Sequence, residues 1–598
     1  RDQFLTLVAV WGVIYLVSCG YPPALLDDAD TVHAEAAREM VESGDWVTLH
    51  VNGIRYLEKA PLMYWLVALS YKLFGVNEFA TRLPIALATL GLMLAALLLG
   101  KFAFGEKAGF YAALCVGSSI GVFLFTRVLW PDVILTLFIT MAFYCFLRAY
   151  EDPTRSRYVY GIYLFGALGV LTKGLIGAAF PGIIILIFLL ITGELRKLLR
   201  FKLLTGTLLF LAVAAPWHIA AGLSNPGTMM RGTPHPSQGR GFFWFYLMNE
   251  HFLRYVGKRY PADYDTVPLP LFLGLHAVWL FPWSFFLPLV IIGIPRRLRR
   301  LDREDRIKLF LVAWAALVII FFCFSTTQEY YTMPSYPAFA LLIGCALARA
   351  ETRWREAKDR SLLNATQIAL ACLGLTVFAG GAIAFWLTRH IVVEGDIAAT
   401  LSRNPEAYAL SLGHVLDLTP RSLAELRIPV IGTALTFLIG TGAALLLRIR
   451  GKHIASNLSL VLMMAVFFSF ARTSLAAFEP YLSSRSLALA IDREYRQGDA
   501  IVINGEYEGG SSINFYTRKL VYILNGRSAN LQYGSYFEDA PRIFLDDEEL
   551  ATMWAGAGRV FLFTDSTMLA ELTGLVRGPA YTLAESGGKL ILTNRQTN

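Results

Sequence analysis

The chain has 598 residues, of which 56% are hydrophobic and only 16% are charged, and its mean hydropathy is +0.51. A soluble protein of this length could not bury so much apolar surface, so the composition excludes a soluble globular enzyme and indicates a polytopic membrane protein. The formal net charge of +8 is mostly an orientation signal and gives no indication of nucleic-acid binding.

Apolar runs long enough to cross a bilayer recur along most of the chain. A membrane-spanning helix needs roughly 20 mostly apolar residues. A shorter run at 61–75 has polar flanks, and we expect it to lie in the interface. We predict about 13 spans, at 4–20, 83–104, 109–126, 133–150, 158–172, 175–192, 203–221, 269–292, 307–325, 333–350, 365–387, 428–447 and 456–476.

Four connectors rich in Arg and Lys indicate the orientation: 193–202, 295–308, 349–360 and 448–453. All four fall on one face when 13 spans alternate, and the positive-inside rule makes that face cytoplasmic. The first loop, the segment 222–268 and everything after residue 476 are then expected outside.

Two outer segments are longer than ordinary connectors. The first loop, 21–60, contains an amphipathic helix with Val32, Ala36 and Met40 on one face, and we expect it to lie along the membrane surface. Asp30 or Thr31 would begin this helix and Ser43-Gly44 would end it. In 222–268, the Gly/Pro-rich stretch "NPGTMMRGTPHPSQGRG" precedes an aromatic and charged helix, a pattern that resembles a lid over a site.

After residue 476 the pattern changes to short strand-like runs, "AIVINGE", "KLVYILNG", "RVFLFTD" and "KLILTN", with helices "SSINFYTR" and "DDEELATMWAGAG" between them. We therefore predict a mainly α polytopic membrane domain, 1–476, followed by a small α/β domain, 477–598, on the outer face. The six cysteines lie in or beside apolar runs and none forms a C-x-x-C pair, so neither a disulfide framework nor a thiolate metal site is indicated.

Ionisable residues gather at the outer ends of the predicted spans, where charge near lipid usually faces a cavity or a partner. Each residue alone has an ordinary structural explanation, such as a helix cap for Asp30 or Asp132 or a helix-surface ion pair for Glu250 and Arg254. Their clustering predicts one water-accessible pocket of mixed charge. The residues are Asp27, Asp28, Asp30, Arg55, Tyr56, Glu58, Lys59, Arg127, Asp132, Lys173, Glu250, His251, Arg254, Glu329 and Tyr331.

Several motifs in roughly the first 340 residues, in order, resemble those of one family. "AEAAREMVESGDW" and "RYLEKAPLMYW" follow the first span, and "TKG", "PW", "EHFLRY" and a second "PW" come later. Together they resemble the GT-C membrane glycosyltransferases and, among these, the lipid A aminoarabinose transferases. Several of the motifs are long, so chance does not explain the agreement.

The resemblance implies an inverting enzyme of the bacterial inner membrane, working on the outer face, that moves a sugar from a polyprenyl phosphate donor to a lipid A-like or glycan acceptor. The first-loop acid, Asp28 or Asp30, and Asp132 would be catalytic or would orient the acceptor. A divalent metal, Zn or Mg/Mn, is implied with its requirement left open; no nucleotide cofactor is expected, and we expect a monomer. Lys59, Lys173 and Arg254 would hold the donor phosphate, with Arg55, Tyr56 and Glu250 as further substrate contacts, and Glu58, His251 and Tyr331 match the metal ligands.

The sequence departs from the family pattern in three places, one of which is His33, where the family has a tyrosine. The family's first acid aligns with Ala29, and Asp30 replaces its Glu, so Asp28 and Asp30 remain alternatives for the base. The family's "K-x-KLP-x-Y" is replaced by "TTQEYY", which loses the lysines. These departures bear on the sugar and the acceptor more than on the fold.

Three other functions compete with this one. Transfer to Ser or Thr of a protein, as in O-mannosyltransferases, would use the same donor chemistry and a carboxylate base, because a hydroxyl is a poor nucleophile. A transporter of lipid-linked sugars would favour repeated halves with broken helices at mid-membrane. The sequence instead has charge at the outer mouth and no internal repeat. A non-catalytic assembly subunit would not need clustered outer acids and bases.

Overall fold

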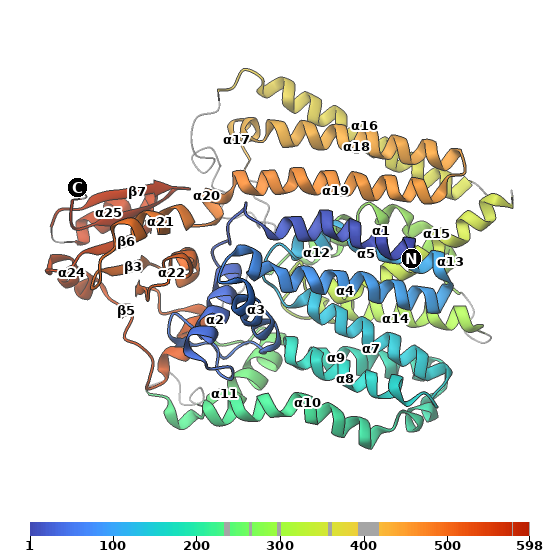
Figure 1. Cartoon of the computed structure of the whole chain (residues 1–598), viewed down its shortest axis with the longest axis horizontal. Helices are drawn as coiled ribbons and strands as arrows, with labels where there is room; N and C mark the ends of the chain where they lie inside the picture. The colour runs from blue at the N-terminus through green and yellow to red at the C-terminus, as the bar shows by residue number, and fades with distance from the viewer. Residues whose placement is uncertain are drawn as a thin grey trace.

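The computed structural model describes residues 1–231, 240–261, 266–295, 301–356, 361–392, 418–576 and 578–596. Long helices run side by side through most of the molecule, and a small domain built on a β-sheet lies at one end of them (Figure 1). This is the predicted fold class, a mainly α membrane protein with a C-terminal α/β domain.

Among the described residues, nine helices are long and apolar enough to cross a membrane. Two further helical segments, α12 (Leu269–Trp279) and Trp283–Gly293, are bent by 92° relative to each other. The second segment contains α13 (Leu287–Gly293), and the two make a tenth span if they are counted as one. The nine are Asp2–Cys19, which begins with α1 (Asp2–Trp11), α4 (Glu78–Phe104), α7 (Asp132–Glu151), α10 (Leu203–Ser224), α14 (Arg303–Cys323), Met333–Arg355, which contains α15 (Tyr336–Arg355), α16 (Ser361–Thr388), α18 (Arg427–Ile449) and α19 (His453–Ala477).

The predicted number of about 13 spans is higher because three predicted runs form helices that are interrupted, short or less apolar. The run 109–126 is split into α5 (Glu106–Ser118) and α6 (Ile120–Phe125) by the extended backbone of Ser119. α8 (Ser156–Lys173) ends at Gly174 (φ 75°), and α9 (Ile176–Ile191) follows at once. At 1.5 Å per residue, α9 is about 24 Å long, shorter than a bilayer's apolar core.

The four basic connectors meet at the end of the bundle that lies opposite the sheet, as the alternation of spans predicts (Figure 1). Arg306 pairs with Glu194 at 3.1 Å, which joins 295–308 to 193–202. Arg349 pairs with Glu304, and Arg448 pairs with Glu351 at 3.3 Å, which links the remaining two connectors. The end of the bundle that lies away from the sheet is therefore the basic end.

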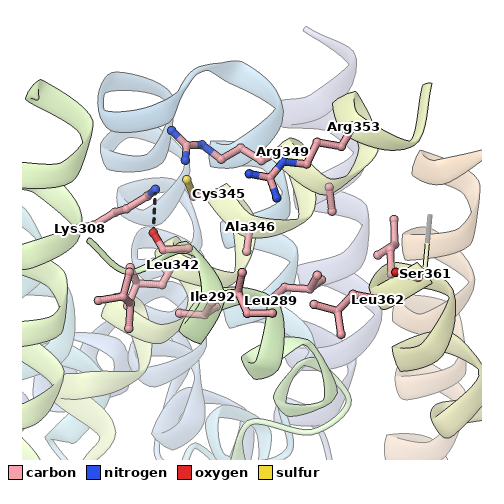
Figure 2. A pocket seen from close by; sticks show the side chains of 15 residues that line it. Leu289, Ile292, Lys308, Leu342, Cys345, Ala346, Arg349, Arg353, Ser361 and Leu362 are labelled. Atoms are coloured by element: carbon pink, nitrogen blue, oxygen red, sulfur yellow. Dashed lines mark hydrogen bonds between the residues drawn. The ribbon is translucent and has the colours of Figure 1, made fainter. Parts of the chain in front are cut away.

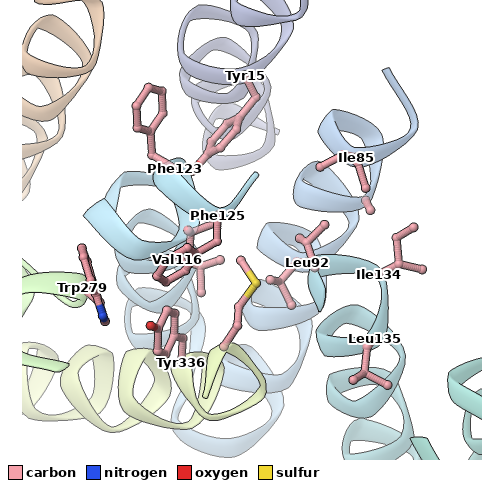
Figure 3. Packing of buried hydrophobic residues seen from close by; sticks show 14 of the residues in the cluster. Tyr15, Ile85, Leu92, Val116, Phe123, Phe125, Ile134, Leu135, Trp279 and Tyr336 are labelled. Carbon is pink, nitrogen blue, oxygen red and sulfur yellow. The ribbon is translucent and has the colours of Figure 1, made fainter. Parts of the chain in front are cut away.

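Aromatic and branched side chains fill the centre of the bundle, where Phe123, Phe125, Leu92 and Trp279 meet between helices (Figure 3). α4 and α5 approach closely because Gly100 faces Gly109: a Cβ on Gly100 would lie 2.5 Å from the Cα of Gly109. Small residues at such crossings let membrane helices pack backbone to backbone.

The first outer loop forms the predicted helix, α2 (Ala29–Ser43), which ends where Gly44 adopts a left-handed conformation (φ 73°). Its start differs from the prediction, because the N-cap is Asp28 rather than Asp30 or Thr31. Its position differs too. α2 packs against α3 (Leu62–Phe74) on one side and α22 (Ser511–Thr517) on another. Residues on its polar face, including Glu35 and Arg38, are buried, so α2 is enclosed between the bundle and the C-terminal domain instead of lying on the membrane.

A short hairpin follows α2, with β1 (His50–Val51) antiparallel to β2 (Ile54–Arg55). In 222–268, α11 (Gly241–Phe243) continues into the π-helical segment η5 (Trp244–Leu253). Of the Gly/Pro-rich stretch predicted to form a lid, 232–239 lies outside the described residues.

The C-terminal domain contains a six-stranded sheet in the order β5-β4-β3-β6-β8-β7. The first four strands in this order are parallel, and β8 and β7 are antiparallel to their neighbours. All four predicted strands are present, and β5 and β7 are added to them. The strands are β3 (Ala500–Asn504), β4 (Tyr522–Leu524), β5 (Phe544–Leu545), β6 (Val560–Asp565), β7 (Tyr581–Ser586) and β8 (Lys589–Thr593).

Helices cover this sheet and connect it to the bundle. Asp546 begins α24 with a capping box in which its side chain accepts the Glu549 N–H, as the sequence predicts. The helices are α20 (Glu479–Leu482), α21 (Arg485–Glu494), α22, α23 (Ala529–Gln532), α24 (Asp547–Ala555) and α25 (Leu569–Leu575). α17 (Pro420–Glu425) packs instead against α16 and α18 of the bundle.

Candidate active site

The three aspartates of the first loop have different surroundings. Asp30 is buried, and its carboxylate accepts the backbone N–H groups of Leu26 at 3.1 Å and Leu129 at 3.0 Å. The guanidinium of Arg82 lies 3.9 Å away. Both oxygens of Asp30 are thus occupied in holding the loop before α2 to the loop before α7.

Asp27 faces the C-terminal domain. Its carboxylate accepts hydrogen bonds from the Ser484 hydroxyl at 2.7 Å and the Ser512 backbone N–H at 2.8 Å, and it pairs with Lys589 at 2.8 Å. Charge-assisted bonds of this kind are stronger than neutral ones. Asp27 therefore docks the sheet domain onto the outer end of the bundle.

Asp28 is the aspartate of this loop that remains exposed to solvent. Its backbone has φ 68°, and its N–H donates to the Glu508 carbonyl at 3.0 Å, so the C-terminal domain holds the loop in this shape. Surrounding protein atoms restrict hydration of the carboxylate and raise the pKa of Asp28 to about 6, although the charge of Lys59 acts in the opposite direction. A carboxylate with this pKa changes protonation close to physiological pH.

Glu58 and Lys59 lie beside Asp28 at the end of the hairpin. The Lys59 ammonium is 2.7 Å from Glu58, and it is 24% exposed, whereas Glu58 is buried. Glu58 also accepts bonds from the Tyr56 hydroxyl at 2.8 Å and from Arg259 at 2.6 Å. Burial would raise the pKa of Glu58, but Lys59 and Arg259 outweigh it and lower that pKa to about 2. Glu58 is therefore a permanent anion.

Arg259 extends the network to the segment η5. Its guanidinium, 4% exposed, donates to Glu250 at 2.7 Å as well as to Glu58. Glu250 in turn pairs with Arg254 at 3.0 Å, and Arg254 donates to the Tyr331 hydroxyl at 3.1 Å. The i, i+4 pair of Glu250 and Arg254 expected from the sequence is thus one link in a longer series of ion pairs.

Lys173 and Asp132 complete the group. The Lys173 ammonium lies 2.6 and 2.7 Å from the two oxygens of Asp132, which begins α7. The same ammonium lies over the rings of Tyr330 and Tyr331, 5.1 and 4.8 Å from their centroids. Tyr331 therefore contacts both Lys173 and Arg254, and Lys59 acts electrostatically on both Asp28 and Asp132.

The structure thus brings together most of the residues that the sequence singled out. One connected network contains Asp28, Tyr56, Glu58, Lys59, Asp132, Lys173, Glu250, Arg254 and Tyr331. Lys59, Lys173 and Arg254 are partly exposed, at 24%, 27% and 18%. They are the cations of the network best placed to meet an anionic substrate.

Arg55 and Arg127 lie outside this network. Arg55 pairs with Asp539 at 2.6 Å, donates to the Ser224 carbonyl at 2.9 Å and stacks over the ring of Phe537. It therefore joins the hairpin to the C-terminal domain. Arg127 donates to the Ser18 carbonyl at 3.1 Å.

The residues expected as metal ligands are engaged elsewhere. The Nδ1 of His251 lies 2.6 Å from the Tyr246 carbonyl, and its Nε2 accepts the Leu175 N–H at 3.1 Å. Glu58 is surrounded by two cations and a tyrosine. Within the described part of the chain, no group of three His, Cys, Asp or Glu side chains is placed to hold a metal ion. Glu58, His251 and Tyr331 do not fit a metal site in this arrangement.

Sequence reasoning assigned no role to three residues of this region. Arg259 links Glu58 and Glu250, and the only feature of the sequence that points to it is its position five residues after Arg254. Glu508 comes from the C-terminal domain and acts electrostatically on Asp28; burial, with Asp28 as a smaller cause, raises the pKa of Glu508 to about 8. His33 packs edge-on against Tyr64, and burial lowers the pKa of His33 to about 4, so it is neutral.

Comparison with known proteins agrees with the motifs. A family model described as "Dolichyl-phosphate-mannose-protein mannosyltransferase" matches residues 58–219. Two curated relatives, from Pseudomonas savastanoi pv. phaseolicola and Aeromonas salmonicida, carry the name "Undecaprenyl phosphate-alpha-4-amino-4-deoxy-L-arabinose arabinosyl transferase". The first is 30% identical over 395 residues, 63% of this chain and 66% of the relative. The second is 32% identical over 358 residues, 58% of this chain and 60% of the relative. The chain thus matches less than two thirds of the length of either relative.

The fold agrees over nearly the whole length. The crystal structure of ArnT from Cupriavidus metallidurans bound to undecaprenyl phosphate matches with a TM-score of 0.79 and 20% identity, covering 99% of this chain and 98% of the other. Its apo form matches with a TM-score of 0.77. The resemblance predicted from the motifs is confirmed, and the fold is that of these membrane proteins.

Proposed function

We propose that this multi-pass membrane protein, similar in sequence to aminoarabinosyl transferases and in fold to ArnT, is an inverting glycosyltransferase of the bacterial inner membrane. It moves 4-amino-4-deoxy-L-arabinose from undecaprenyl phosphate to lipid A on the periplasmic face. Two features support this orientation: the basic connectors gather at one end of the bundle, and the charged network and the sheet domain lie at the other.

The observation that carries the proposal is the position of the exposed Asp28 beside Lys59. The charge of Lys59 also attracts the carboxylate of Asp132, which pairs with Lys173. In the reaction, an acceptor oxygen bonds to the anomeric carbon while the bond from that carbon to the donor phosphate oxygen breaks. The acceptor proton passes to Asp28, and undecaprenyl phosphate leaves with the bonding electron pair. A general base works best when its pKa lies close to the operating pH, and the pKa of Asp28, about 6, meets this condition.

The leaving phosphate gains negative charge in the transition state, and fixed cations in a site poor in water stabilise such charge strongly. Lys59, Lys173 and Arg254 reach this region from three separate segments of the chain. Asp132 orients Lys173 through both of its oxygens. Glu250 and Arg259 hold Arg254 and Glu58 in place without themselves meeting substrate.

Mass spectrometry of lipid A tests the function directly. Cells that express the chain should carry aminoarabinose on lipid A, and otherwise identical cells that lack it should not. If lipid A is unchanged and O-linked mannose on proteins depends on the chain, the second candidate holds, protein O-mannosylation. That candidate is favoured by the family model over 58–219. If neither product depends on the chain, the proposal is wrong.

Removing the Lys59 ammonium should weaken donor binding. We expect Lys59→Ala to raise the KM for the donor about 10–100-fold, because it loses a charge-assisted contact with the phosphate. Lys258→Ala is the matched control, since Lys258 is an exposed lysine of another outer segment. Steady-state kinetics with purified enzyme in nanodiscs gives both constants. Equal KM values for the two variants would contradict the assignment of Lys59 to the donor phosphate.

A further inference from the structure

A cavity lies at the opposite end of the bundle from the charged network. It has a volume of about 270 Å³ and is lined by residues of α13, α14, α15 and α16. This volume is slightly below that of pockets which enclose a drug-sized molecule. The cavity would therefore hold one part of a larger ligand whose remainder lies outside it.

Apolar side chains form one side of this cavity. Leu289, Ile292, Leu342 and Leu362 lie together below the two arginines in Figure 2. Ile292 is 54% exposed on the outer surface of the bundle, and Ile291 beside it is 64% exposed. Because these residues belong to helices that cross the membrane or end in it, the cavity opens towards lipid.

Cations form the other side. Lys308, Arg349 and Arg353 line the cavity, and its lining contains no acidic residue. Lys308 donates to the Gly293 carbonyl at 3.2 Å, and both Lys308 and Arg349 pair with Glu304, which lies outside the lining. Arg353 is exposed and forms no ion pair with the residues that the structure describes.

We propose that this cavity binds an anionic phospholipid of the cytoplasmic leaflet, with its phosphate at Arg349 and Arg353 and the start of an acyl chain against Leu289, Ile292 and Leu362. Basic pockets between membrane helices on the cytoplasmic side bind anionic headgroups. The bound lipid fills the space between α13, α15 and α16, and so joins the helix pair α16–α18 to the rest of the bundle. This site is distinct from the proposed transfer reaction and does not depend on it.

Native mass spectrometry of the full chain, with defined lipids added to the detergent, tests the site. We expect phosphatidylglycerol to be retained and phosphatidylethanolamine to be lost at matched concentrations. Arg353→Gln should weaken phosphatidylglycerol binding about fivefold, the effect of one basic residue near an anionic lipid surface. Ala346→Phe, which fills the cavity, should abolish retention.

Arg355→Gln is the control, because Arg355 is an exposed arginine of the last turn of α15 that does not line the cavity. It should bind phosphatidylglycerol as the unaltered chain does. Equal retention of the two lipids would overturn the proposal. So would equal loss in Arg353→Gln and Arg355→Gln, or undiminished binding to Ala346→Phe when its melting temperature shows that it is folded.

Discussion

Asp28→Asn should reduce kcat about 10²–10⁴-fold, the usual contribution of a general base, while the Kd for the donor changes little. The substitution isolates the carboxylate, because Asn has nearly the same shape as Asp and so meets the same backbone strain at φ 68° and ψ −136°. The backbone N–H of residue 28 keeps its bond to the Glu508 carbonyl. Single-turnover transfer and donor binding, measured separately in nanodiscs, distinguish the two effects.

The pH dependence adds a second readout. Asp28 accepts a proton only when it is ionised, so kcat/KM should fall about tenfold per pH unit below its pKa of about 6 and level off above it. Asp28→Asn should lose this acidic limb. A variant with full activity, or one that keeps the limb unchanged, would show that Asp28 is not the base.

Asp30→Asn provides the contrast. The buried Asp30 accepts two backbone N–H groups and lies near Arg82, so its loss should lower the melting temperature. Asp28→Asn, at an exposed carboxylate, should leave that temperature nearly unchanged. The two aspartates that sequence reasoning left as alternatives would then separate into one catalytic and one structural residue.

The fold and the membership of the network could be predicted because they depend on local patterns. Apolar runs and basic connectors indicate the spans, and charged residues at span ends identify Lys59, Asp132 and Lys173. Among the described residues, fewer helices than predicted spans are long and apolar enough to cross a membrane, because Ser119 divides one run and the helices on either side of Gly174 are short or less apolar.

The roles of individual residues could not be predicted where the partner is distant in sequence. Asp27 pairs with Lys589, and Arg55 pairs with Asp539, so each joins the first loop to a domain that begins more than 400 residues later. Neither ion pair can be recognised from the sequence around either of its residues. Glu508 was missed for the same reason, since only the docking of the C-terminal domain places it near Asp28.

Arg259→Gln should destabilise the protein by about 3 kcal/mol, the lower end of the range for breaking a buried ion pair. The lower end applies because Glu58 keeps Lys59 and Glu250 keeps Arg254 as partners. Nevertheless, two carboxylates that are 1% and 2% exposed lose a cation that lies 2.6 and 2.7 Å from them. Thermal melting of the enzyme in nanodiscs, followed by intrinsic fluorescence, measures the loss.

Arg231→Gln is the matched control, because Arg231 and Glu538 form the same kind of pair, at 3.2 Å, on the surface. Their side chains are 72% and 49% exposed, and exposed pairs contribute little. Adding Glu58→Gln to Arg259→Gln should restore part of the stability, since one unbalanced buried charge is then removed. If Arg259→Gln melted as Arg231→Gln does, Arg259 would not be needed to hold the network. Lys59 and Arg254 would then have to be positioned by substrate instead of in advance of it.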